Sequence, residues 1–163
     1  MKRLCVCLTA AALCGGCQYD PFVARLTAQR PRAEDAVGRN KLTEQTVTDG
    51  GLPALNGKAS AVILLAGGKS TASNVPAAPY ETGLPDAGFF RTLVSGSGTW
   101  RIDEAGGGPG GSGQKLIFWG VSFQSPAADI KEATFTGDKP PYGLLFTIGD
   151  PDGGHATICE RQP

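Results

Sequence analysis

The chain has few of the residues that carry most enzyme chemistry. It contains one histidine, His155, and that residue lies four positions before Cys159 in one expected strand. This spacing places both side chains on one face of the strand but about 13 Å apart along it, which is too far for a base to activate a nucleophile. The sequence therefore predicts no catalytic residue and no enzyme activity.

An excess of either charge is also missing. The chain has 15 basic and 15 acidic residues, and loss of Lys2 and Arg3 with an N-terminal leader leaves 13 against 15, a net charge of −2. The protein has no excess of positive charge with which to displace counterions from the phosphates of a nucleic acid, so no nucleic-acid partner is expected. The apolar stretch from Leu4 to Leu13 is too short to span a bilayer as a helix, and with its basic start it reads as an export signal.

Motifs for phosphate and calcium are incomplete. Gly67-Gly68-Lys69-Ser70 lacks the first glycine of a phosphate loop, because Ile63 occupies the position five residues before Gly68. Asp150-Pro151-Asp152-Gly153 resembles half of a calcium loop, but Arg161 stands at the twelfth position, where a bidentate glutamate is required. The sequence predicts no cofactor and no metal, and it reads residues 67–68 as a hairpin turn.

Glycine and proline are abundant. The 24 Gly and 12 Pro, beside one Met, suit an all-β protein with tight turns better than a helical bundle, and 163 residues give room for one domain. Apolar and polar residues alternate in segments separated by turn residues, which predicts a single small antiparallel barrel or sandwich of about seven to nine strands. The expected strands cover residues 38–48, 58–66, 70–74, 97–103, 115–123 and 129–136, followed by a hairpin over 142–161.

The C-terminal hairpin allows a prediction of register. A five-residue loop places Phe146 opposite Ile158, whereas a four-residue loop places Phe146 opposite Thr157. Because apolar residues pair best with apolar residues on one face, we expect the five-residue loop. The same argument predicts one core shared by Trp100, Trp119, Phe146 and Ile158.

Two further segments are expected to be loops. Residues 75–88 contain three prolines and two glycines, a density that excludes both helix and interior strand. The aromatic pair Phe89 and Phe90 that follows either caps the core or faces a partner. Residues 105–113 read AGGGPGGSG and are expected to form a flexible, passive hairpin loop.

The residues after the apolar stretch carry a processing motif. In Leu13-Cys14-Gly15-Gly16-Cys17, two small residues stand directly before a cysteine. This resembles the lipobox of bacterial lipoproteins, whose cysteine is acylated on sulfur and becomes the new N-terminus. Cys14 departs from the family pattern, which usually has Leu at the third place before that cysteine. An ordinary cleaved signal is the alternative interpretation.

The resemblance to lipoproteins implies a domain organisation. Residues 1–16 would be the signal peptide, residues 17–37 a lipidated N-terminus and flexible tether, and residues 38–163 the antiparallel β domain. The lipid on Cys17 would hold the protein on a membrane of the cell envelope, and Gln18 resembles the residue choice of outer-membrane lipoproteins. With Cys17 acylated and the leader removed, only Cys159 remains, so no disulfide is expected and Cys159 should be a small buried hydrophobe.

The start of the β domain carries a second resemblance. Gly38-x-Asn40-Lys41-Leu42 opens a run of meandering strands and is similar to the first strand of lipocalin-type barrels, which begins Gly-x-Trp. Asn40 stands where that family has Trp. The resemblance implies a carrier of a small apolar ligand.

These observations favour a membrane-anchored exported lipoprotein with a non-catalytic binding or structural role in the cell envelope. Its partner would be a protein or a small apolar ligand, and the sequence assigns no binding residues. A lipocalin-like carrier is the alternative, and a hydrolase of unknown type that uses carboxylates is the third hypothesis.

Overall fold

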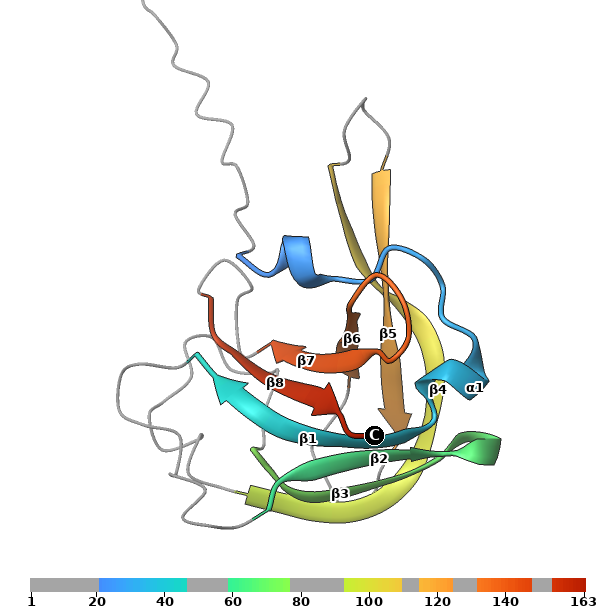
Figure 1. Cartoon of the computed structure of the whole chain (residues 1–163), viewed down its shortest axis with the longest axis vertical. Helices are drawn as coiled ribbons and strands as arrows, with labels where there is room; N and C mark the ends of the chain where they lie inside the picture. Colours follow the sequence, from blue (N-terminus) through green and yellow to red (C-terminus); the bar gives the residue numbers. More distant parts are fainter. Residues whose placement is uncertain (1–20, 47–58, 77–92, 110–114, 125–131, 148–153) are drawn as a thin grey trace, which may run out of the picture.

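A computed structural model describes residues 21–46, 59–76, 93–109, 115–124, 132–147 and 154–163. In these residues, antiparallel strands follow one another in sequence order and close into an eight-stranded barrel, because the last strand pairs with the first (Figure 1). The all-β prediction of a small antiparallel barrel or sandwich is confirmed, and the architecture is the barrel. The strands are β1 (Gly38–Gln45), β2 (Ala61–Leu65), β3 (Lys69–Pro76), β4 (Leu93–Pro109), β5 (Lys115–Gln124), β6 (Glu132–Thr136), β7 (Gly143–Thr147) and β8 (Ala156–Arg161).

The main core fills the inner face of the barrel. Every strand alternates between the inside and the outside, so β2 buries Val62 and Leu64 completely while the neighbouring Leu65 is largely solvent-exposed. Trp100 is buried in this core, as predicted, and Trp119 packs against it partly buried. The core thus joins side chains from all eight strands, with members that include Leu42, Val62, Val75, Trp100, Val121, Phe135, Leu144 and Cys159.

The register of the C-terminal hairpin differs from the prediction. Phe146 pairs with Thr157, and Leu144 pairs with Cys159. Phe146, Leu144 and Cys159 belong to the inner core. Because neighbouring residues of a strand point to opposite faces, Ile158, next to Cys159, lies on the outer face. The prediction failed because it assumed that only one face of the hairpin is apolar.

A second, smaller core covers the outside of β7 and β8. Ile158 and Leu145 pack there against Phe22, and Leu26 is packed against the same cluster. The expectation that Ile158 shares one core with Trp100 and Phe146 is therefore wrong. An apolar residue on the outer face of this barrel is buried because another segment of the chain lies over it.

That segment is residues 21–37, which we call the strap. It contains a short 3-10 turn, η1 (Val23–Arg25), and one helical turn, α1 (Ala33–Ala36), and it runs across one end of the barrel (Figure 1). Phe22 and Ala36 are buried, and Thr27 has no exposed surface. The prediction of a flexible tether is wrong for residues 21–37, because these side chains pack on the barrel. Residues 17–20 lie outside the described part of the chain.

Thr27 fastens the strap between two strands. β5 and β6 pair directly over only a short stretch, from Gly120 to Ser122 on β5. Beyond it, the Thr27 N–H donates to the Phe135 carbonyl of β6 at 2.9 Å, and the Trp119 N–H of β5 donates to the Thr27 carbonyl at 3.1 Å. The Thr27 hydroxyl also donates to the Gly137 carbonyl at 2.6 Å. The strap therefore supplies hydrogen-bond partners that the two strands no longer give each other.

The structure of the glycine run at residues 106–108 also differs from the prediction. β4 continues to Pro109, and Gly106, Gly107 and Gly108 pair with Phe118, Ile117 and Leu116 of β5. Glycine keeps both backbone hydrogen-bonding groups, so it can continue a ladder opposite a strand with strong β propensity. The expected loop over residues 105–113 is therefore strand as far as Pro109, and residues 110–113 lie outside the described part. Figure 1 shows this ribbon extending beyond the other strands.

The predictions for the turns before and after β3 compare differently with the structure. Gly67 and Gly68 form the predicted hairpin turn as part of η2 (Ala66–Gly68) and have φ values of 74° and 73°, a region that favours glycine. The loop expected over residues 75–88 begins later than predicted, because Val75 and Pro76 end β3 and pair with Val94 and Leu93 of β4. Residues 77–88 lie outside the described part of the chain. So do Phe89 and Phe90.

Packing of the strap predicts a stability difference between two neighbouring residues. Phe22 is 7% exposed in the outer core, whereas Val23 is 43% exposed. We expect Phe22→Ala to lower the free energy of unfolding by about 3 kcal/mol, because a buried aromatic side chain is removed. Val23→Ala is the matched control and should change it by less than about 0.5 kcal/mol. Equal, small effects of both substitutions in urea unfolding would show that the strap does not pack on the barrel.

Candidate functional site

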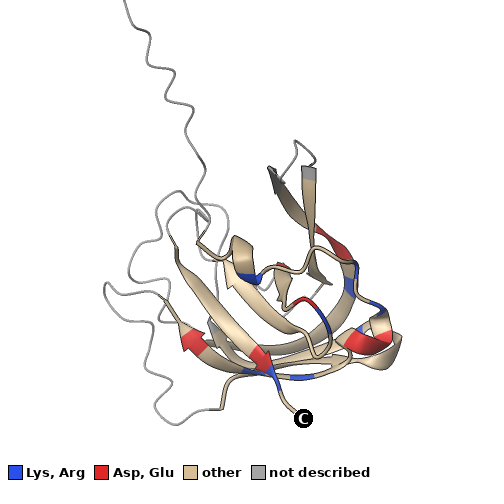
Figure 2. Cartoon of the chain, turned by 45° about the horizontal axis from the view of Figure 1, so that its top comes forward, with Lys and Arg blue, Asp and Glu red and all other residues tan. Residues whose placement is uncertain are grey.

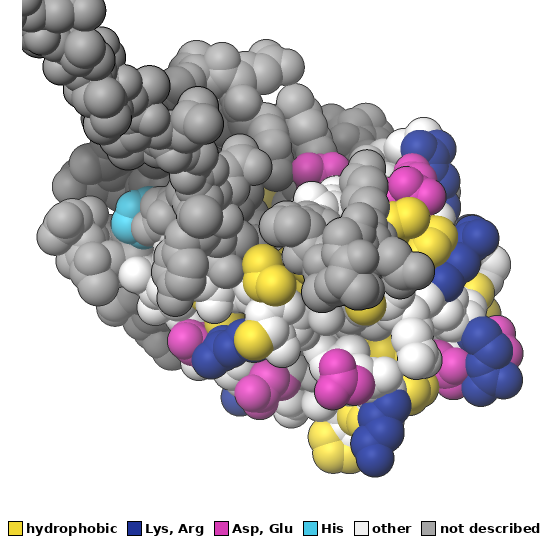
Figure 3. All heavy atoms as spheres, turned by 90° about the horizontal axis from the view of Figure 1, so that it is seen from above, with side chains coloured by type: hydrophobic (Ala, Val, Ile, Leu, Met, Phe, Trp, Pro, Cys, Tyr) yellow, Lys and Arg dark blue, Asp and Glu magenta, His cyan; other side chains and the backbone are white. Residues whose placement is uncertain are grey.

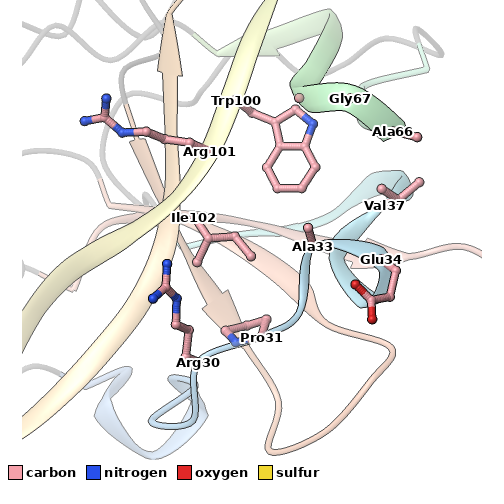
Figure 4. Close-up of a pocket in the computed structure, with 11 residues that line it drawn as sticks. Arg30, Pro31, Ala33, Glu34, Val37, Ala66, Gly67, Trp100, Arg101 and Ile102 are labelled. Carbon is pink, nitrogen blue, oxygen red and sulfur yellow. The ribbon is translucent and has the colours of Figure 1, made fainter.

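A cleft opens where the strap, the β2–β3 turn and β4 meet (Figure 4). Its volume is about 620 Å³, which lies within the usual range of small-molecule sites. The strap contributes one wall, residues 66–68 of the turn contribute another, and residues 100–102 of β4 contribute the third. Three segments that are far apart in the sequence thus form the hollow.

Trp100 forms the inner end of the cleft. Its indole N–H donates a hydrogen bond to the Leu65 carbonyl oxygen at 3.0 Å, which fixes the ring between β4 and the turn. The turn itself lies close to β4, because a Cβ at Gly68 would stand 3.1 Å from the Trp100 carbonyl oxygen. A glycine is therefore needed there both for its positive φ and for this close approach. The wall around Trp100 is fixed by backbone contacts.

The rest of the lining is mostly apolar. Val37 and Ile102 line the cleft and also pack against the inner core, so its floor is continuous with the interior of the barrel. Pro31 is buried at the strap side, and Ala33 presents its small side chain to the opening. Such a surface gains free energy by covering an apolar ligand at roughly 25 cal/mol per Å² removed from water.

Two arginines near the cleft, Arg101 and Arg32, already have carboxylate partners. Arg101 contacts Asp103 at 2.9 Å, and the hydrogen bond from Arg101 is the main reason why the pKa of Asp103 is lowered. In Figure 4 the Arg101 side chain points away from the cleft. On α1, Asp35 lies 2.8 Å from Arg32, and this hydrogen bond raises the pKa of the Arg32 guanidinium; Glu34 lies 3.5 Å from Arg32.

Arg30 is the exception among these arginines. Its guanidinium carbon lies 4.9 Å from the centre of the Trp119 ring, in a cation–π contact. No carboxylate of the described residues lies within ion-pair distance of it. Figure 4 shows the Arg30 side chain pointing toward Ile102 at the edge of the cleft. Arg30 therefore brings to a mostly apolar hollow a positive charge that has no carboxylate partner among the described residues.

A second group of polar atoms lies along β1 and β8. Among the described residues, buried side-chain atoms without a hydrogen-bond partner include Asn40 Oδ1, Ser60 Oγ and Thr157 Oγ1, together with Gln45 Nε2 and His155 Nδ1. Asn40 and Thr157 alternate with outer-face residues and so lie on the inner face. Asn40 is 1% exposed at the position where lipocalin-type strands carry Trp. This wall of the barrel is thus more polar than the inner face of β4 to β7.

The residues singled out from the sequence do not assemble into a reactive site. Cys159 is fully buried in the inner core, as predicted, and burial raises the pKa of its thiol to about 12. The thiol is therefore protonated at neutral pH, and the protonated form is a poor nucleophile. Cys17 lies outside the described residues. Within the described ranges, no three His, Cys, Asp or Glu side chains gather as metal ligands would, and no helix is both long and apolar enough to cross a membrane.

Local sequence patterns do not identify the residues that form the cleft. Arg30 and Pro31 lie in the segment that the sequence predicts to be a flexible tether. Trp119 was correctly placed on an apolar face, but its contact with Arg30 depends on a segment 89 positions earlier in the chain. The inward-facing position of Thr157 follows from the alternation of β8 when the hairpin has the four-residue loop, which places Thr157 opposite Phe146.

Comparisons with protein-family models, with curated proteins and with solved structures found no match to the chain. The resemblance to lipocalin-type barrels therefore stays an expectation from the sequence.

Proposed function

We propose that the mature protein is a non-catalytic binding protein of the cell envelope, anchored by lipid on Cys17, that holds a small and largely apolar ligand in the cleft beneath the strap. The observation that carries this proposal is the cleft of about 620 Å³, with Trp100 and Ile102 on its floor. Pockets of this size with an apolar lining and few polar groups are typical of small-ligand sites. A lipocalin-like carrier is the related alternative, with the ligand inside the barrel instead.

Membrane anchoring would hold the barrel close to the lipid surface. The strap begins at residue 21, only four positions after Cys17, and an extended chain of that length spans at most about 14 Å. Because the strap packs on the barrel, the barrel would be held near the membrane rather than at the end of a long flexible linker. Gln18 favours the outer membrane as the location.

The outer surface offers less support for a large protein partner. Among the described residues, the exposed large apolar side chains Val23, Leu65 and Leu116 belong to three different elements. Figure 2 shows basic and acidic residues distributed together over the barrel, and Figure 3 shows small groups of hydrophobic side chains between charged ones. Docking surfaces for proteins usually include a larger contiguous apolar area. The cleft is therefore the better candidate for binding.

The anchor can be tested by one substitution. Cys17→Ser removes the sulfur that would be acylated, so the protein should move from the membrane fraction to the soluble fraction. Cys7→Ser is the matched control, because Cys7 would leave with the signal peptide and lies outside the lipobox-like motif, so this variant should stay on the membrane. Fractionation followed by immunodetection measures both. Membrane retention of the Cys17→Ser protein would contradict the anchor.

The cleft can be tested with an uncharged apolar probe. N-phenyl-1-naphthylamine should increase its fluorescence on binding the mature chain carrying Cys17→Ser, because it would leave water for an apolar site. Ala33→Phe places a large ring at the opening and should weaken probe binding at least about tenfold, a change of about 1.4 kcal/mol. Ala24→Phe adds the same ring to an exposed position of η1 outside the cleft and should have little effect. Equal binding by both variants would place the ligand elsewhere.

A further inference from the structure

We infer that the ligand of the cleft is an amphiphile with one carboxylate, and that Arg30 is the residue that selects it. This inference rests on the proposed binding function and adds the chemical class of the ligand. Its basis is that Arg30 is the cleft arginine that lacks a carboxylate partner within the described residues. A carboxylate is a natural complement, because the guanidinium fork matches the two oxygens of that group.

The position of Arg30 is fixed from both sides. Thr27, three residues before it, is held by backbone hydrogen bonds to Phe135 and Trp119. Pro31, directly after it, is buried at the cleft. Trp119 then lies 4.9 Å beneath the guanidinium. A ligand would therefore bind the side chain of a residue whose backbone is already ordered, and this order reduces the entropy cost of forming the contact.

The cation–π contact with Trp119 leaves hydrogen-bonding capacity on Arg30. A π face offers no acceptor atom for the five N–H donors of a guanidinium, so these donors can still bind the oxygens of a ligand. No ion pair within the described residues competes for them.

The other charges near the cleft make Arg30 the favoured point for an anion. Arg101 is engaged by Asp103 and points away from the cleft, and Arg32 is engaged by Asp35. Glu34 would repel an anion, but Figure 4 places its side chain on the opposite side of the cleft from Arg30. A bound amphiphile would therefore set its carboxylate at Arg30 and its apolar body along Ile102 toward Trp100, with Glu34 remote from the anionic end.

Decanoate and decanol provide a matched pair of ligands, because they share a ten-carbon chain and differ in charge at pH 7.5. Each is titrated against N-phenyl-1-naphthylamine bound to the mature chain carrying Cys17→Ser. We expect decanoate to displace the probe at about a tenfold lower concentration than decanol. In Arg30→Gln this preference should disappear through weaker decanoate binding, with decanol binding within about twofold of the parent.

Arg101→Gln is the control, since it removes a cleft arginine that Asp103 already neutralises. It should leave the preference for decanoate intact. Equal displacement by the two ligands in the parent chain, or an unchanged preference in Arg30→Gln, would overturn the role of Arg30 and leave the proposed apolar binding site standing. Probe binding that neither ligand displaces would reject an aliphatic carboxylate as the ligand, and absence of probe binding would reject the proposed function itself.

Discussion

The hydrogen bonds of Thr27 are the constraint on which the strap and the candidate cleft depend. β5 and β6 separate after a short paired stretch, and the backbone of Thr27 bonds to both strands where they part. Its hydroxyl adds a third bond, to the turn after β6. Unpaired buried backbone groups cost about as much free energy as a lost hydrogen bond, so the strap stabilises the strands as much as they stabilise it.

Two consequences follow from this one attachment. On one side of Thr27, Phe22 and Leu26 are brought over the outer face of β7 and β8, where they bury Ile158. On the other side, Arg30 is brought over Trp119, and Pro31 closes the cleft beside β4. The second core and the candidate binding site are thus products of the same short segment. The proposed carboxylate specificity depends on this attachment as well, because it brings Arg30 within reach of Trp119.

The sequence was sufficient to predict the strands but insufficient to predict the strap. Strand alternation depends on neighbouring residues, so β2, β5 and β8 can be recognised from local sequence. The strap has no such period, because Phe22, Thr27 and Pro31 each contact a different part of the barrel. The hairpin register failed for the same reason: Ile158 looks like an inner residue unless Phe22 is known to cover it. The cleft joins three segments from separate regions of the chain, which no local pattern can bring together.

Native-state hydrogen exchange of three amides tests the central claim, that the strap is an integral part of the barrel. The N–H groups of Thr27, Trp119 and Gly137 all bond across the attachment, to Phe135, Thr27 and Arg25 respectively. The structure predicts that they exchange with protection similar to that of the Leu144 and Cys159 amides in the paired strands β7 and β8, because they open only with the barrel. Exchange of the Thr27 and Gly137 amides at rates close to those of an unstructured peptide, while Leu144 and Cys159 stay protected, would contradict the account.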